Sequence, residues 1–282
     1  MKISFLGTAA SEGWPSLFCQ CEACKRARSA GGRNIRTRQQ VLLNDDLLLD
    51  FGPDTLMHVN QQMIDLSRIH DVLVTHAHSD HFYPEDMMKI TCNYTPVIDD
   101  RLLNVYGNED VVRAGNDAHE MKNRWKGCDS IHFELLKAFE WYEIAERYKV
   151  LVLPAVHDRS QNCYIYYIRS EDSSVLYACD SGYFGEETFK ALSGLKIDAL
   201  ILECTGIFKD LGHGHSNIEW LLKIRERLSS QGSLREGTRT FATHVCHSGA
   251  YRDGRSYIHE ELSNELIQHG VELCYDGMTV II

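Results

Sequence analysis

The stretch from Val72 to Phe82, VLVTHAHSDHF, constrains the fold and the chemistry of this chain more than any other. Its apolar, β-branched start predicts a buried strand from Val72 to Thr75. Four residues that can bind metals follow within six positions: His76, His78, Asp80 and His81. Loops that leave a rigid sheet can bring such side chains to one point. The pattern therefore predicts a metal site at the C-terminal end of a buried strand.

The spacing of these ligands suggests two ions rather than one. His76 and His78 alternate along an extended segment and can face the same point, whereas Asp80 and His81 lie where the chain turns. One ion can take the first two histidines, and the other can take the carboxylate and the third histidine. A single histidine here would usually be a polar loop residue, so the prediction depends on the whole pattern.

The rest of the chain predicts one α/β domain, residues 1–282, because no linker, low-complexity tract or repeat interrupts it. Early strand pairs precede strand–helix alternation, which favours two sheets with outer helices. A turn from Asn44 to Asp46 should join two early strands. We predict strands within 2–7, 40–52, 70–76, 102–107, 149–155, 163–168, 174–180, 198–204, 239–244 and 278–282, and helices within 85–93, 217–230 and 258–270.

Charge and hydropathy limit the partners and the location. The formal net charge is −11, so the protein's field would repel a polyanion, and large nucleic acids are disfavoured as partners. The N-terminal MKISFLG does not resemble an export signal, and no apolar run approaches the roughly 18 residues that span a bilayer. We expect a cytoplasmic protein without a membrane partner.

Ten cysteines without an export signal are poorly explained as a disulfide framework. Three are clustered as Cys19, Cys21 and Cys24, which suggests thiolate ligands, although a redox pair at Cys21 and Cys24 is the alternative. We expect most of the others to be small buried hydrophobic residues: Cys92, Cys128, Cys163, Cys179, Cys204, Cys246 and Cys274.

With these motifs in place, the sequence resembles the metallo-β-lactamase superfamily. THAHSDH is similar to the family signature, and LLLDFG, VHD, CDSG, GHSN and THVCHSG follow the family's order around it. The resemblance is strongest to phosphodiesterases that act on cyclic phosphates and are associated with carbon–phosphorus lyase pathways. Those enzymes also carry a Cys-x-Cys-x-x-Cys cluster. The resemblance implies a four-layer αβ/βα sandwich with its metal site at one edge.

The resemblance also implies how the ligands are shared. A first set would be His76, His78 and His157, a second set would be Asp80, His81 and His244, and Asp180 would bridge both ions. The residues themselves agree, since His157, Asp180 and His244 each follow an apolar strand. Asp50 is expected to accept a hydrogen bond from a ligand histidine and fix its tautomer. An Asx-type turn before Gly52 is the other explanation for Asp50.

The resemblance implies a structural zinc as well, held by the three clustered cysteines and His247. A closed zinc site needs four such ligands. Cys246 competes with His247 for the fourth position, but an extended backbone would point it the other way.

Two ions about 3.5 to 4 Å apart can hold a bridging hydroxide at neutral pH and clamp a phosphoryl group. We therefore expect hydrolysis of a small, cyclic phosphodiester, with manganese, zinc or iron as the metal pair. The catalytic residues expected are Asp80, within the second set, and His215, which would protonate the leaving oxygen. His213 is the competitor of His215, but only His215 lies directly before the predicted helix start.

Two other activities of this fold are alternatives. A tRNA 3′-processing nuclease would use the same motifs but would need a basic docking arm, which we do not find. A thioester or lactone hydrolase is the third possibility. Residues 93–146, which include Trp125 and Trp141, contain a candidate substrate cover, although most of their aromatic rings are expected to pack in the core.

The expected partner is a small phosphodiester, and a homodimer is the oligomeric state left open. The remaining histidines are expected to be surface or packing residues without a chemical role: His58, His70, His119, His132, His259 and His269.

Overall fold

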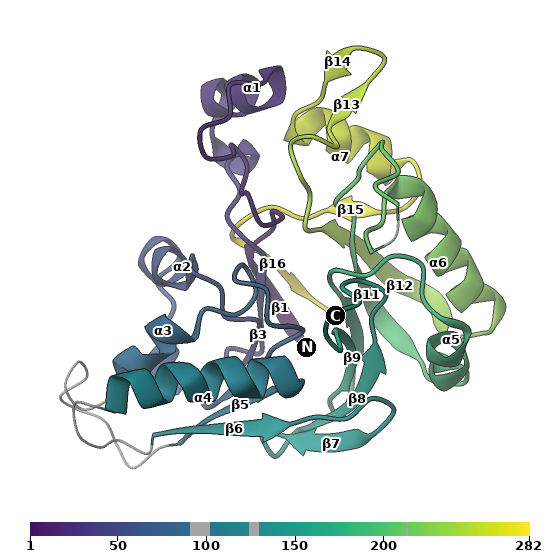
Figure 1. Cartoon of the computed structure of the whole chain (residues 1–282). Helices are drawn as coiled ribbons and strands as arrows, with labels where there is room; N and C mark the ends of the chain where they lie inside the picture. Colours follow the sequence, from purple (N-terminus) through teal and green to yellow (C-terminus); the bar gives the residue numbers. More distant parts are fainter. Residues whose placement is uncertain (91–101, 124–129, 213) are drawn as a thin grey trace.

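Two seven-stranded sheets face each other in the computed structural model, which describes residues 1–90, 102–123, 130–212 and 214–282 (Figure 1). The first sheet has the order β16 (Met278–Ile281), β1 (Lys2–Gly7), β2 (Gln40–Leu43), β3 (Leu47–Leu49), β4 (Asp71–Leu73), β5 (Leu103–Gly107) and β6 (Ile131–Leu135). The second has the order β15 (Glu272–Leu273), β12 (Leu234–Thr243), β11 (Ile197–Glu203), β10 (Ser174–Ala178), β9 (Tyr164–Arg169), β8 (Tyr148–Pro154) and β7 (Trp141–Ile144).

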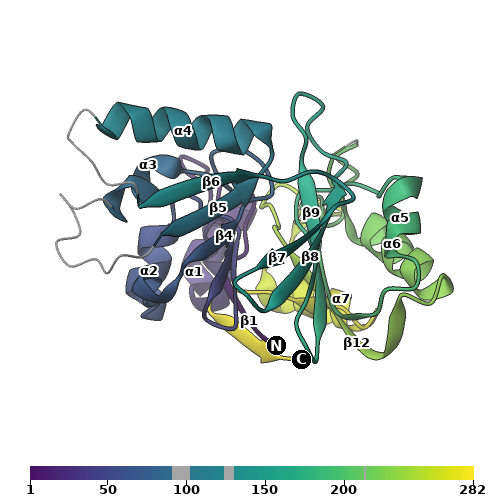
Figure 2. The same cartoon turned by 90° about the horizontal axis from the view of Figure 1, so that it is seen from below.

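Helices cover the outer face of each sheet (Figure 2). The first sheet carries α2 (Thr55–Gln62), α3 (Pro84–Met87) and α4 (Glu109–Asn123). The second carries α5 (Glu186–Leu192), α6 (Ile218–Ser230) and α7 (His259–Ile267). At one end of the molecule lie α1 (Glu22–Ala30) and the hairpin of β13 (Tyr251–Arg252) and β14 (Arg255–Ser256). Short 3₁₀ turns span Gly32–Asn34, Leu66–Arg68 and Met88–Ile90.

Three apolar clusters hold these layers together. The inner cluster lies between the sheets and contains Phe5, Tyr166 and Phe241, all fully buried. The other two clusters lie between each sheet and its helices, around Val105 and Leu221, for example. Because apolar side chains line both faces of each sheet, the order of layers is helix, sheet, sheet, helix. The predicted four-layer αβ/βα sandwich is confirmed.

Parallel pairing brings the chemistry-bearing segments to one edge. In the first sheet β3, β4 and β5 are parallel, and in the second β10, β11 and β12 are parallel. The carboxyl ends of parallel strands meet at the same edge. Asp50 follows β3, the histidine motif follows β4, Asp180 follows β10 and His244 follows β12.

The predicted strands are all present, and Asn44 and Asp45 form the expected turn with positive φ. Several boundaries differ: β12 begins at Leu234 rather than at Arg239, and β4 ends at Leu73 rather than at Thr75. The reason at β4 is local, because the backbone N–H of Thr75 donates to the carboxylate of Asp50, at 2.8 Å, instead of to a strand. The predicted helix at 85–93 is α3 followed by a 3₁₀ turn, and residues 91–93 lie outside the described part of the chain.

Two further predictions concern membrane-spanning helices and the candidate substrate cover. In the part of the chain that the structure describes, no helix is long and apolar enough to cross a membrane. The predicted cover within 93–146 falls partly on residues 93–101 and 124–129, including Trp125, which lie outside the described residues, as do Cys92, Cys128 and His213.

Candidate active site

The first set of predicted ligands converges on one point. Nδ1 of His78 lies 2.9 Å from Nε2 of His76 and 3.2 Å from Nε2 of His157. The opposite nitrogens each lie 3.0 Å from a partner, which is Thr75 Oγ1 for His76, Asp158 Oδ2 for His78 and the Gly214 carbonyl for His157. Such outer partners fix the tautomer, so each imidazole presents an unprotonated nitrogen to the shared point.

The second set has the same construction. Nε2 of His81 lies 3.3 Å from Nε2 of His244 and 3.2 Å from the carboxylate of Asp80. Nδ1 of His81 donates to Asp50 at 2.9 Å, the contact expected of Asp50. Nδ1 of His244 lies 2.8 Å from Thr205 Oγ1, whose hydroxyl donates to the carbonyl of His244 itself. The ring nitrogens that face inward are therefore left for a ligand.

Asp180 lies between the two sets. Its Oδ2 is 2.9 Å from Nε2 of His81, 3.4 Å from Nε2 of His76 and 3.8 Å from Nε2 of His157. Its Oδ1 is 3.1 Å from Nδ1 of His244. Burial would raise the pKa of Asp180, but the imidazoles of His244 and His81 hold that pKa well below its ordinary value. The position is the one a bridging carboxylate requires.

The site contains one feature that a metal ion would resolve. Oδ1 of Asp180 is buried and has no hydrogen-bond partner among the described residues. Leaving a buried carboxylate oxygen unpartnered is costly, so such an atom needs an explanation. The donors around it are imidazole nitrogens and carboxylate oxygens, the ligands that divalent transition metals accept. The residues present therefore fit divalent ions.

The backbone is strained where it presents these groups. Asp50, Asp180 and His244 all adopt positive φ, at 64°, 47° and 53°. Residues with side chains rarely occupy this region, and such outliers concentrate at functional sites. Position 52 requires glycine because of a close approach rather than because of its φ, since a Cβ there would lie 2.1 Å from the carbonyl oxygen of Asp80. Its hydrogen lets the second set approach the strand that carries Asp50.

His215 lies at the rim of the site, and a residue that the sequence analysis missed holds it. Nδ1 of His215 is 3.2 Å from Oε1 of Glu203, a buried carboxylate at the end of β11, and 3.5 Å from Oδ1 of Asp180. Burial would lower the pKa of His215, but the hydrogen bond and the charge of Glu203 raise it to about 9. Only its place at a strand end could have pointed to Glu203, since a single glutamate carries no motif.

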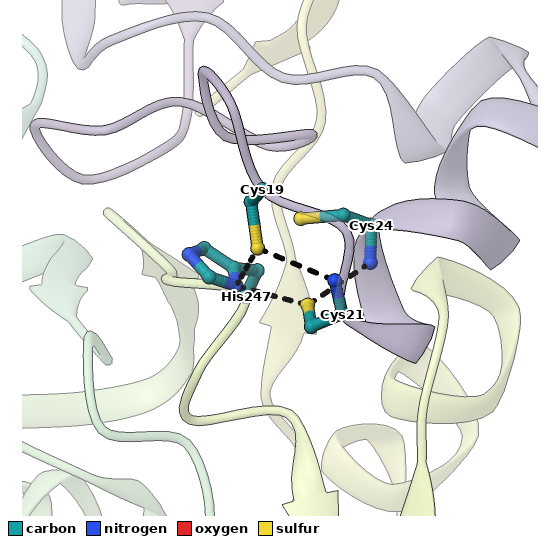
Figure 3. Close-up of side chains that lie close together, drawn as sticks. All are labelled: Cys19, Cys21, Cys24 and His247. Carbon is teal, nitrogen blue, oxygen red and sulfur yellow. Dashed lines mark hydrogen bonds between the residues drawn. The ribbon is translucent and has the colours of Figure 1, made fainter.

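The cysteine cluster forms a group of possible metal ligands that is distinct from the first and second sets (Figure 3). The ligand atoms of Cys19, Cys21, Cys24 and His247 all lie within 4.8 Å of one another. Sγ of Cys21 is 3.3 Å and Sγ of Cys19 is 3.8 Å from Nδ1 of His247. Burial opposes ionisation of Cys21, but hydrogen bonds from the Tyr251 hydroxyl and the Cys24 amide lower its pKa to about 6. The arrangement suits a closed tetrahedral site.

Cys246, the other candidate for the fourth zinc ligand, makes its contacts outside the cysteine cluster. Sγ of Cys246 lies 3.1 Å from Oγ of Ser248 and accepts from the amide of Gly249. Every cysteine of the described residues is free, and those outside the cluster are buried: Cys163, Cys179, Cys204, Cys246 and Cys274. Cys179 was expected only to pack, yet its Sγ lies within 4.8 Å of ligand atoms of His81, Asp180 and His244.

Two histidines agree with the expected surface or packing role, and one tryptophan differs from the expectation of a buried ring. His58 and His259 are buried and hydrogen-bonded: His58 bonds Thr37 and Gln40, and His259 bonds Arg36. They are packing residues rather than surface ones. Trp141 is 48% exposed. It therefore does not pack in the core, where most aromatic rings of residues 93–146 were expected to pack. Strand β7 is an edge strand, which leaves one face of that ring uncovered.

The fold and these two ligand clusters define a class of protein. The family model of the β-lactamase superfamily domain matches residues 46–245, and the chain belongs to this family. It is a metal-dependent hydrolase of the metallo-β-lactamase fold.

Three solved structures show the same fold over nearly the whole chain. A new diphosphatase from the PhnP family is 21% identical with a TM-score of 0.75, covering 99% of this chain and 96% of that one. Zn²⁺-bound PqqB from Methylobacterium extorquens is 18% identical with a TM-score of 0.75, covering 100% of both chains. The short form of human tRNase Z is 18% identical with a TM-score of 0.67, covering 100% of this chain and 99% of that one.

One curated protein matches in sequence over a shorter segment. It is an octanoyltransferase from Porphyromonas gingivalis, 31% identical over 121 residues. The match covers 42% of this chain and only 22% of that protein.

Proposed function

We propose that this chain is a phosphodiesterase that hydrolyses a small, cyclic phosphodiester with two divalent ions. The observation that carries the proposal is the pair of His215 and Glu203, 3.2 Å apart, beside a carboxylate that faces both ligand sets. An alkoxide is a poor leaving group at neutral pH and gains from a proton donor. Thioester hydrolysis has less need of such a pair, because its leaving group is a thiolate.

The ions would be held by the first set, the second set and Asp180. When bound, two such ions supply a nucleophile at neutral pH and positive charge toward the phosphoryl oxygens. Manganese, zinc and iron all suit a site of histidine and carboxylate ligands. The outer nitrogen of each of the five imidazoles has its own acceptor, so the neutral ring carries its proton there and its inner nitrogen can bind an ion.

His215 acts on the leaving oxygen in this proposal. Its Nδ1 is engaged by Glu203, which leaves Nε2 as the nitrogen that can donate to substrate. Both oxygens of Glu203 also accept backbone N–H groups, Oε1 from Ser216 and Oε2 from Thr205, each at 2.7 Å. Those bonds hold the carboxylate still, so the imidazole has a fixed direction.

The exposure of the site residues favours a small substrate at one rim. The side chains of His78 and His215 are 39% and 28% exposed, whereas those of His76 and His81 are fully buried. Among the described residues, the site is therefore more accessible on the side of His78 and His215 than on the side of His76 and His81. The net charge of −11 disfavours a long polyanion there. Two fold neighbours, a diphosphatase and a tRNase, carry names that refer to phosphate chemistry.

The cysteine cluster would hold a structural zinc rather than a catalytic ion. Three thiolates and one imidazole complete a four-ligand shell, which leaves no position open for substrate. We propose that this zinc stabilises the segment from His244 to His247, which supplies one ligand to each centre.

A second candidate activity is hydrolysis of an acyl thioester. The segment shared with the octanoyltransferase favours it, because that name denotes transfer of an acyl group. The shared segment is a small part of that protein, so we rank this candidate below phosphodiester hydrolysis.

A substrate panel distinguishes the candidates. Metal-free protein would be loaded with Mn²⁺ or Zn²⁺ and assayed on a 2′,3′-cyclic nucleotide, a nitrophenyl diester, an octanoyl thioester, a lactone and precursor tRNA. We expect turnover of the small diesters, abolished in Asp180→Asn and unchanged in the exposed control Asp172→Asn. Turnover confined to the thioester, the lactone or the tRNA would contradict the proposal and select the corresponding alternative.

A further inference from the structure

The carboxylate of Asp50 is the most heavily hydrogen-bonded group beneath the site. It is fully buried and accepts four hydrogen bonds. Oδ1 accepts from the backbone N–H of Thr75 at 2.8 Å and from its hydroxyl at 2.9 Å. Oδ2 accepts from Nδ1 of His81 at 2.9 Å and from the hydroxyl of Tyr177 at 3.0 Å. Four donors leave this carboxylate one position and one orientation.

Asp50 reaches one histidine of each ligand set. It holds His81, of the second set, directly. It holds His76, of the first set, through Thr75, because the Thr75 hydroxyl donates to Asp50 and so must accept from Nδ1 of His76 at 3.0 Å. A displacement of this one carboxylate would therefore misalign ligands of both ions.

Tyr177 is the donor to Asp50 that comes from the opposite sheet. It lies in β10, three residues before Asp180, and its side chain is fully buried. Burial, together with the charge of Asp50, raises the pKa of Tyr177 well above its ordinary value, so the hydroxyl retains its proton. Asp50 follows β3 of the first sheet, so this hydrogen bond crosses the interface between the sheets.

The same hydroxyl continues the network toward the second set. It accepts from Nε2 of Gln39 at 3.5 Å, and Oε1 of Gln39 accepts from the hydroxyl of Thr243 at 2.6 Å. Thr243 directly precedes His244. Tyr177 thus lies between Asp50, which holds His81, and the end of β12, which presents His244.

We propose that Tyr177 is a positioning residue that orients Asp50, and through it His81 and His76, so that its hydroxyl strengthens metal binding at both ligand sets. The proposal rests on the metal-dependent part of the proposed function and is independent of the substrate. Tyr177 touches no inward-facing ligand nitrogen, so it acts only through the carboxylate.

A matched control exists on the neighbouring strand. Tyr167 in β9 is also buried, and its hydroxyl donates to the carbonyl of Lys196 at 2.8 Å. It packs in the cluster on the helix side of the sheet, whereas Tyr177 packs between the sheets. Tyr177→Phe and Tyr167→Phe each remove one hydroxyl and one donated hydrogen bond from a tyrosine of this sheet. Only the first removes a donor to Asp50.

The test is a calorimetric titration with Co²⁺ alone of protein whose two ligand sets are empty and whose cysteine cluster holds one zinc in every variant. We expect Tyr177→Phe to weaken binding of both ions by about threefold to tenfold, the value of one hydrogen bond. Tyr167→Phe should bind both ions as wild type does. Wild-type affinity in Tyr177→Phe, or equal weakening in Tyr167→Phe, would overturn the proposal.

A second variant keeps the proposal testable if Tyr177→Phe does not fold. Thr75→Val preserves shape and the backbone N–H but removes the link from Asp50 to His76. It should weaken the first ion and leave the second within about twofold, because the direct bond to His81 remains. Unchanged binding of the first ion would refute the shared anchor. If wild type binds no Co²⁺, the proposed function fails instead, and if it binds Co²⁺ without cleaving diesters, only the substrate assignment fails.

Discussion

Replacing His215 should slow hydrolysis by an amount that depends on the leaving group. An alkyl diester leaves as a basic alkoxide, so His215→Ala should reduce its kcat by about 10²- to 10⁴-fold, the usual contribution of a general acid. A nitrophenyl diester departs without protonation, and its kcat should fall less than about tenfold. His215→Ala and wild type should hold the same metals, because His215 belongs to neither ligand set.

The hydrogen bond between His215 and Glu203 predicts how much Glu203→Gln slows hydrolysis. Oε1 of Glu203 accepts a hydrogen bond from Nδ1 of His215 at 3.2 Å. Hydrogen bonds to charged groups contribute about 1.5 to 3 kcal/mol. Glu203→Gln should therefore slow the alkyl diester by about tenfold to a hundredfold. Since both carboxylate oxygens accept backbone N–H groups, an amide NH₂ at either position would face a donor.

The assay compares kcat for one alkyl and one nitrophenyl diester and measures metal content by elemental analysis. His132→Ala, an exposed change in β6, is the matched control and should leave both rates unchanged. Equal losses on the two esters would refute proton donation and indicate that His215 positions the phosphate. Loss of an ion in His215→Ala would make His215 a metal ligand.

Three further outcomes follow from other contacts. Cys21→Ser should release the zinc and lower the urea midpoint, whereas the buried control Cys163→Ser should keep its zinc; a zinc-free variant with wild-type stability would contradict a structural role. Gly52→Ala should weaken the second ion by at least about tenfold, since its Cβ would meet the Asp80 carbonyl at 2.1 Å, and metal titration tests this. Burial lowers the pKa of His58 from 6.5 to about 4, so its stabilisation is complete above 6.5 and is lost as the pH falls toward 4. Between pH 7 and 5, urea unfolding of wild type should lose about 2 kcal/mol more than His58→Gln, and identical pH slopes would count against it.

The ligands of both sets could be predicted because they follow local rules. Each lies in the segment that follows an apolar strand, and strand ends are visible in hydropathy and spacing. Asp50 was predictable for the same reason. The cysteine cluster carries its own spacing, and α1 begins within it, with Cys21 as the N-cap.

Glu203, Thr75 and Tyr177 could not be predicted in their roles. Glu203 and Tyr177 are ordinary strand residues, and Thr75 lies just after β4. The role of each depends on the residues that other parts of the fold place beside it. The tautomers of four of the five histidines have the same origin, because their acceptors are distant in sequence, whereas the acceptor of His76 is its neighbour Thr75. Sequence patterns report which residues reach the edge of a sheet, and the pairing of the two sheets decides what they meet there.

The central claim is that two ions, one in each ligand set, hydrolyse a small phosphodiester. The most direct measurement starts from protein whose two ligand sets are empty and whose cysteine cluster holds its zinc. It is titrated with Mn²⁺ while hydrolysis of a cyclic phosphodiester is recorded. We predict that the rate rises until two equivalents are bound per chain and then becomes constant. Full activity at one equivalent, or no hydrolysis of the diester when both sets are filled, would contradict the account.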